Sequence, residues 1–144
     1  MLTEKTFSTG NVELFYVEGP PSSPPLVLLH GGFALWQRFL PLLPTLILRW
    51  QLFAVDFRGH GASGRVRVAP DRPHPYRALA IIEKMDTLQE ILPEEPAAFF
   101  GHSAGGYGAL YYAAHHPQHV RAVIIGDSPL SRTGLDAITL AARP

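Results

Sequence analysis

The sequence contains no cysteine among its 144 residues, which excludes disulfide bonds and thiolate-ligated metal sites. It also lacks any charge imbalance, because twelve Lys and Arg residues stand against twelve Asp and Glu residues. A neutral chain gives no electrostatic reason to bind nucleic acid or an anionic membrane surface. We therefore expect neither of these as a partner.

No stretch is suited to entering a membrane or a secretory pathway. Residues 1–5 lack the basic-then-apolar pattern of a signal peptide. The apolar run from Leu40 to Trp50 is interrupted by Pro41, Pro44 and Arg49, and it is too short to span a bilayer. We expect a cytoplasmic protein.

Motifs for phosphate-bearing cofactors and metals are also lacking. No glycine–lysine phosphate loop is present, and no histidine–carboxylate spacing indicates a metal site. Residues 59–64 do match the dinucleotide pattern G-x-G-x-x-G after a predicted strand. However, Pro70, Pro73 and Pro75 prevent the helix that must follow this pattern to hold a pyrophosphate. We expect no cofactor and no metal.

Short apolar runs alternate with segments of helical spacing along the chain. Such runs are typical of strands that are covered on both faces, and their alternation with helices predicts a mostly parallel α/β sheet with helices on both faces. A hairpin is expected first, at residues 5–9 and 12–17. Buried strands are expected at 26–29, 52–55, 97–100 and 120–125, and helices at 35–40, 76–92, 107–115 and 135–141.

Residues 101–106, with the sequence GHSAGG, lie between a predicted buried strand and a predicted helix. A Gly-x-Ser-x-Gly pentapeptide in this context is the sequence form of a nucleophile elbow, a sharp turn that exposes a serine hydroxyl. Gly101 and Gly105 provide room for the flanking chains to pass closely. Ala104 can offer its backbone N–H to a developing oxyanion. Taken alone, the same residues also fit a glycine-rich connection with an incidental serine.

Three further polar clusters follow predicted strands, at His30-Gly31-Gly32, at residues 56–64 and at Asp127. In parallel sheets, ligands bind at the carboxyl ends of the strands, so these clusters are expected on one rim with Ser103. The three motifs around His30, Asp56 and Ser103, in this order, resemble the α/β-hydrolase family over most of the chain. The resemblance implies that Ser103 is the nucleophile. It also implies that Gly32, with Phe33 as second choice, donates the other oxyanion hydrogen bond beside Ala104.

The resemblance also indicates the class of reaction. Dehalogenases and epoxide hydrolases of this family carry an aspartate at the elbow, whereas a serine implies an acyl-enzyme intermediate. We therefore expect a serine hydrolase that acts by acyl transfer on a small ester-like substrate, as esterases, lipases and thioesterases do.

A serine nucleophile needs a histidine base oriented by a carboxylate, and in this family the histidine comes last in the chain. Asp127 is a candidate acid, but it fits equally well as a helix cap or turn residue. No histidine follows it, since the seven histidines are at positions 30, 60, 74, 102, 115, 116 and 119. None of these is expected to be the base, and His102 in particular is expected to pack beside the elbow rather than face the hydroxyl.

The simplest interpretation is that residues 1–127 are the N-terminal part of a hydrolase domain, truncated after about the sixth strand. Residues 128–144 would then begin a cap region or a C-terminal tail. The strand at 120–125, from Val120 to Ile125, would become an open aliphatic edge that self-associates, unless missing C-terminal sequence completes the sheet. The alternative is a non-catalytic binding or interaction protein that retains part of a hydrolase scaffold.

Overall fold

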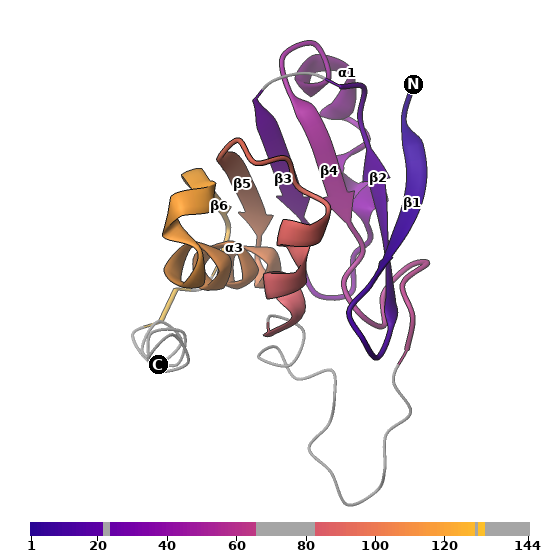
Figure 1. Ribbon diagram of the computed structural model, residues 1–144, viewed down its shortest axis with the longest axis vertical. Coiled ribbons are helices and arrows are strands. Elements are labelled where there is room, and N and C mark those ends of the chain that lie inside the picture. Colours follow the sequence, from indigo (N-terminus) through magenta and orange to yellow (C-terminus); the bar gives the residue numbers. More distant parts are fainter. Residues whose placement is uncertain (22–23, 66–82, 129, 132–144) are drawn as a thin grey trace, which may run out of the picture.

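The computed structural model describes residues 1–21, 24–65, 83–128 and 130–131. Within them, strands form one sheet in the order β1-β2-β4-β3-β5-β6 (Figure 1). β1 and β2 form an antiparallel hairpin, β2 pairs antiparallel with β4, and the remaining pairs are parallel. The expected mostly parallel α/β sheet is confirmed. The strands are β1 (Thr3–Ser8), β2 (Glu13–Glu18), β3 (Pro25–Leu29), β4 (Gln51–Val55), β5 (Ala97–His102) and β6 (Val120–Gly126).

The helical elements differ from those expected in two places. The helix predicted at 35–40 is a 3₁₀ turn, η1 (Trp36–Phe39), and it is followed by a short helix that was not predicted, α1 (Leu43–Leu46). Pro44 lies in the first turn of α1, where proline is tolerated. The described part of the helix predicted at 76–92 is a 3₁₀ helix, η2 (Glu83–Glu90).

The remaining elements are α3 (Ala104–His115), which is the predicted helix after the elbow, and η3 (Pro117–His119). Residues 76–82 and the helix predicted at 135–141 lie outside the described residues. In the part of the chain that is described, no helix has the length and apolar character needed to cross a membrane.

Alternate side chains of the parallel strands enter two separate cores, as the two-residue period of a strand requires. Val27 and Leu29 of β3 belong to the larger core, which η2 and α3 cover on the near side of the sheet in Figure 1. Leu26 and Leu28 belong to the smaller core, which η1 and α1 cover on the other face. Both faces of the central strands are therefore buried, which explains their continuous apolar sequences.

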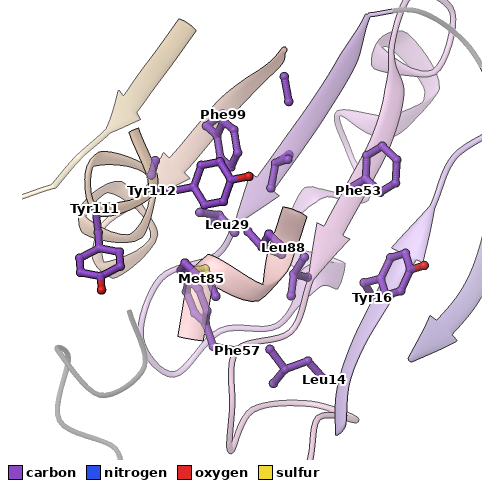
Figure 2. Packing of buried hydrophobic residues seen from close by; sticks show 14 of the residues in the cluster. Leu14, Tyr16, Leu29, Phe53, Phe57, Met85, Leu88, Phe99, Tyr111 and Tyr112 are labelled. Carbon is purple, nitrogen blue, oxygen red and sulfur yellow. The ribbon is translucent and has the colours of Figure 1, made fainter. Parts of the chain in front are cut away.

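The larger core fixes α3 and η2 against the sheet. The ring of Tyr112 stacks on that of Phe99 from β5, with 4.7 Å between the ring centroids (Figure 2). Met85 and Leu88 of η2 are also buried in this core. Burial of such side chains stabilises a fold by roughly 1.5–3 kcal/mol each. This packing holds the start of α3 at the end of β5, where Ser103 lies.

β6 is less buried than its aliphatic sequence predicted. It is an edge strand of the described sheet and pairs with β5. Ile124 has 53% of its surface exposed, and Arg121 and Ala122 are also exposed. The prediction of a strand covered on both faces is therefore wrong for β6, because no described element packs over its outer side.

Candidate active site

Ser103 connects β5 to α3 with a backbone conformation that L-residues rarely adopt. Its φ is 52° and its ψ is −116°. Such a conformation is strained for a residue with a side chain, and it persists only where the surroundings enforce it. Here the Ser103 N–H donates to the Gly126 carbonyl of β6 at 2.9 Å, and the Ser103 carbonyl accepts the Gly106 N–H at 2.9 Å. The expected sharp turn between strand and helix is therefore present at Ser103.

The glycines that flank Ser103 are required by close backbone approaches. A Cβ on Gly101 would lie 2.2 Å from the Gly105 carbonyl oxygen. A Cβ on Gly105 would lie 2.1 Å from the Leu29 carbonyl oxygen, at the end of β3. Both distances are far below van der Waals contact. The two glycines thus let β3, β5 and α3 converge around the serine.

The residues after β6 also hold the Ser103 turn. The Ser128 hydroxyl donates to the Ser103 carbonyl oxygen at 2.7 Å. Between Gly126 and Ser128, both bonded to the Ser103 backbone, lies Asp127, whose φ is 50° and whose side chain is exposed. Asp127 is therefore at the rim beside the serine, in a conformation that aspartate tolerates in turns.

The loop after β3 lies directly against the serine. A Cβ on Gly31 would lie 3.2 Å from Ser103 Cβ. We name the hollow between this loop and the serine the Ser103 cavity; its volume is about 410 Å³. It is lined by residues 31–35, by Gln37 and Arg38 of η1, and by His102 and Ser103. The motifs around residues 30–33 and 101–106 are thus brought together at one cavity, as expected.

His30 fixes the start of this loop from inside the protein. Its Nδ1 donates to the Gly31 carbonyl at 2.7 Å, and its Nε2 accepts the Phe57 N–H at 3.0 Å. The imidazole is fully buried, and this burial lowers the pKa of His30 below its ordinary value of 6.5. His30 is therefore a neutral structural link between the ends of β3 and β4, with neither nitrogen available to act as a base.

Asp56 at the end of β4 links the same loop to the chain at residues 57–64. One carboxylate oxygen accepts the Trp36 N–H at 2.7 Å, and the other accepts the Ala62 N–H at 3.1 Å. Its backbone carbonyl accepts the Ser63 hydroxyl at 2.6 Å, and that hydroxyl accepts the Phe15 N–H from β2. A carboxylate buried to 1% exposure is stabilised by such hydrogen bonds.

The other described histidines are held in structural contacts or lie along α3 and η3. His60 donates through Nδ1 to the Arg58 carbonyl at 3.1 Å, and its Nε2 accepts the Phe33 N–H at 3.4 Å. His115 bonds the Tyr111 carbonyl, and His116 pairs with Asp86 at 2.9 Å. His74 lies outside the described residues.

His102 is the last residue of β5, and it lines the Ser103 cavity together with the serine. We expected it to pack beside the elbow rather than face the hydroxyl, and this stays a prediction. Its Nδ1 is buried without a hydrogen-bond partner, close to Gly31, where a Cβ would lie 3.0 Å away. The half-buried imidazole therefore forms part of the cavity wall.

Sequence reasoning missed several residues that shape this site. The role of Asp56 as a link between loops, the Ser128 hydrogen bond and the presence of Arg38 in the cavity were not foreseen. The sequence position of Asp56 could have indicated its role, since a carboxylate directly after a buried strand needs hydrogen-bond donors near the rim of the sheet. Among the described residues, no group of three or more histidine or carboxylate side chains is arranged to hold a metal ion.

Comparison with known proteins identifies chains of similar sequence and fold. The sequence profile of the family described as the alpha/beta hydrolase fold matches residues 24–144. A pimeloyl-[acyl-carrier protein] methyl ester esterase of Neisseria meningitidis is 35% identical over 108 residues, which are 74% of this chain and 37% of the esterase. A fluoroacetate dehalogenase of a Burkholderia species is 32% identical over 122 residues, or 82% of this chain and 38% of the dehalogenase.

A solved structure is similar over nearly the whole chain. The structure of a putative lipase from Acinetobacter baumannii superimposes with a TM-score of 0.75 at 26% identity, and the match covers 92% of this chain and 44% of the lipase. The chain spans about a third to two fifths of the length of the first curated relatives it matches.

Proposed function

The chain belongs to the α/β-hydrolase family, and on this premise we propose that it carries the nucleophile of a serine hydrolase that acts by acyl transfer on an ester-like substrate. The observation that carries the proposal is the strained backbone of Ser103, which lies at a cavity that is also lined by the loop after β3. Strain of this kind is concentrated at functional sites. Both an esterase and a dehalogenase are among the relatives, and the serine at the elbow favours acyl transfer for this chain.

In the proposed reaction, Ser103 Oγ attacks the carbonyl carbon of the ester. The serine proton passes to a base, which gives it to the leaving alcohol oxygen as the ester bond breaks. Water then hydrolyses the acyl-enzyme, which releases the acid and restores the serine hydroxyl. The N–H groups of Gly32 and Ala104 would stabilise the oxyanion. Ala104 is the first residue of α3, so its N–H has no acceptor within the helix. Gly32 is preferred to Phe33 because the Phe33 N–H is directed to His60.

The general base is proposed to come from outside these 144 residues, either from downstream sequence or from a second chain. His30 and His60 support this view, since both ring nitrogens of each are engaged in hydrogen bonds. Asp127 would serve as the orienting acid, because Gly126 and Ser128 on either side of it hold the Ser103 backbone. Residues 1–127 would form the N-terminal part of the hydrolase domain, and residues 128–144 the start of a cap or tail.

The second candidate is a non-catalytic binding protein on the same scaffold. It is favoured by the structural hydrogen bonds of His30 and His60, since both ring nitrogens of each are engaged and cannot take the Ser103 proton. Such a protein would use the Ser103 cavity for binding alone. It would turn over no activated ester even when correctly folded.

Labelling with a fluorophosphonate probe tests the proposal. The probe reacts with activated serines, and the labelled peptide is identified by mass spectrometry. Reaction at Ser103 that is abolished in Ser103→Ala supports the nucleophile. Equal labelling of the wild type and Ser103→Ala would exclude it.

A further inference from the structure

We propose that Arg38 selects substrates in which the chain that extends from the reacting carbonyl ends in an anionic oxyacid group, a carboxylate or a phosphate. The inference rests on the proposed function, because it treats the Ser103 cavity as the substrate cavity. Arg38 lies in η1, directly after the loop that contacts the serine, and it is one of the residues that line that cavity.

Arg38 also lines a second hollow, which we name the Phe39 cavity. This hollow has a volume of about 220 Å³ and is lined by Arg38, Phe39, Leu42, Phe100 and His102. Arg38 and His102 belong to the walls of both cavities, so the two hollows adjoin at these residues. A chain that extends from the reacting carbonyl at Ser103 toward the Phe39 cavity would therefore pass beside Arg38.

The surroundings of Arg38 are otherwise uncharged. Among the described residues that line the two cavities, Arg38 is the one with a fixed charge at neutral pH. Within the described chain, the structure shows no ion pair or hydrogen bond that engages its guanidinium. A guanidinium always carries its charge and presents several N–H donors in a planar fork that matches carboxylate and phosphate oxygens.

The apolar residues beside Arg38 define the rest of the ligand. Leu35 and Leu42 are exposed by 39% and 48%, and Phe33 is fully exposed at the mouth of the Ser103 cavity. An aliphatic chain would cover this surface while its anionic end pairs with Arg38. The geometry thus fits an ester or thioester whose aliphatic chain ends in an oxyanion. A simpler role, in which the Arg38 stem merely covers Phe39 and Leu42, predicts no preference for anions.

The test compares pairs of ligands that share an aliphatic chain and differ in charge. Monomethyl suberate and dimethyl suberate form the carboxylate pair, and octyl phosphate and octanol form the phosphate pair. Affinities are measured by nuclear magnetic resonance titration of the full chain. We expect the wild type to bind the anionic member of at least one pair about tenfold more tightly, as a charge-assisted hydrogen bond allows. The pair with the larger ratio identifies the group.

Three variants make the result decisive. Arg38→Gln should abolish the preference for the anion, and Arg38→Lys should retain part of it. Arg49→Gln, an exposed arginine that follows α1 and lines neither cavity, should leave the preference unchanged. Equal affinity of the wild type for both members of each pair overturns the inference, as does a preference that survives in Arg38→Gln or a failure of all four ligands to bind.

The binding assay does not depend on the reactivity of Ser103, so the two proposals can fail separately. Ser103→Ala should retain the preference for anions. If that variant selects anions while the wild-type serine is never labelled, the Arg38 inference stands and the nucleophile proposal falls.

Discussion

The carboxylate of Asp56 accepts the backbone N–H of Trp36 at 2.7 Å, although the two residues are twenty positions apart in the sequence. This bond ties the end of the loop that follows β3 to the end of β4. The other oxygen of Asp56 holds the Ala62 N–H. Through these bonds a buried carboxylate determines the position of the loop that carries the proposed oxyanion donor.

Replacement of Asp56 by Asn should therefore destabilise the fold. One acceptor oxygen becomes an NH₂ group that faces a backbone donor, and the loss of a buried charged acceptor costs about 1–3 kcal/mol. We expect the free energy of unfolding, measured by urea denaturation, to fall by about 2 kcal/mol. Asp86→Asn is the matched control, because the Asp86 side chain is 41% exposed and its pairing with His116 should contribute less than about 1 kcal/mol. Equal effects of the two substitutions would contradict this account of Asp56.

Gly105→Ala should distort the elbow. The new Cβ would lie 2.1 Å from the Leu29 carbonyl oxygen and must push β3 away from α3. We expect a loss of more than about 2 kcal/mol in unfolding free energy, since overpacking against backbone is poorly relieved. Gly32→Ala is the control: a Cβ there would meet no atom within 4 Å, so its effect should stay within about 0.5 kcal/mol. A thermal melt that ranks the two variants in the reverse order would refute the close approach.

The sequence predicts the parts of this site that follow from strand ends. Continuous apolar runs identify β3, β4 and β5, and the polar residues that come next, such as His30 and Ser103, are then placed on one rim. What could not be predicted depends on contacts between distant residues. The bonds of Asp56 to Trp36 and of Ser128 to Ser103 require the folded sheet, and nothing local in the sequence indicates them.

Local propensity also misled the prediction of helices. Pro44 lies in α1, a helix that was not predicted; proline has no N–H to donate, but the first turn of a helix does not need one. The residues of η2 have helical spacing, yet they form a 3₁₀ helix in which Met85 and Leu88 are buried against the sheet. Packing, rather than intrinsic propensity, decides the form of such short elements.

The stability of the fold should depend on the protonation of His30. Burial lowers the pKa of His30 in the folded state, so the unfolded chain binds more protons as the pH falls below the ordinary value of 6.5. The contribution of the neutral imidazole to the free energy of unfolding is thus fully present above that pH. It decreases as the pH falls, by up to about 1.4 kcal/mol for each pH unit. Urea denaturation between roughly pH 5 and pH 8 should show this slope. His30→Gln should be less stable at high pH but should lack this contribution to the slope; an unchanged slope would argue against His30 as its source.

The exposed edge of β6 is proposed to mediate self-association of the 144-residue chain. Aliphatic side chains line this edge, and Ile124 is 53% exposed. Light scattering over a series of protein concentrations should show oligomers for the wild type and a shift toward monomer for Ile124→Lys. Leu48→Lys, at a position 77% exposed after α1, should not change the association. A wild type that is monodisperse and unfolds cooperatively as a monomer would disprove this proposal.

The central claim is that Ser103 is placed as a nucleophile while its base lies outside this chain. The most direct measurement is the rate of fluorophosphonate labelling of Ser103 as imidazole is added in solution to replace the missing base. The account predicts slow labelling without imidazole, a rate that rises with imidazole concentration in the wild type, and no label at this position in Ser103→Ala. A Ser103 that stays unlabelled at every imidazole concentration, or equal labelling of the wild type and Ser103→Ala, would contradict it.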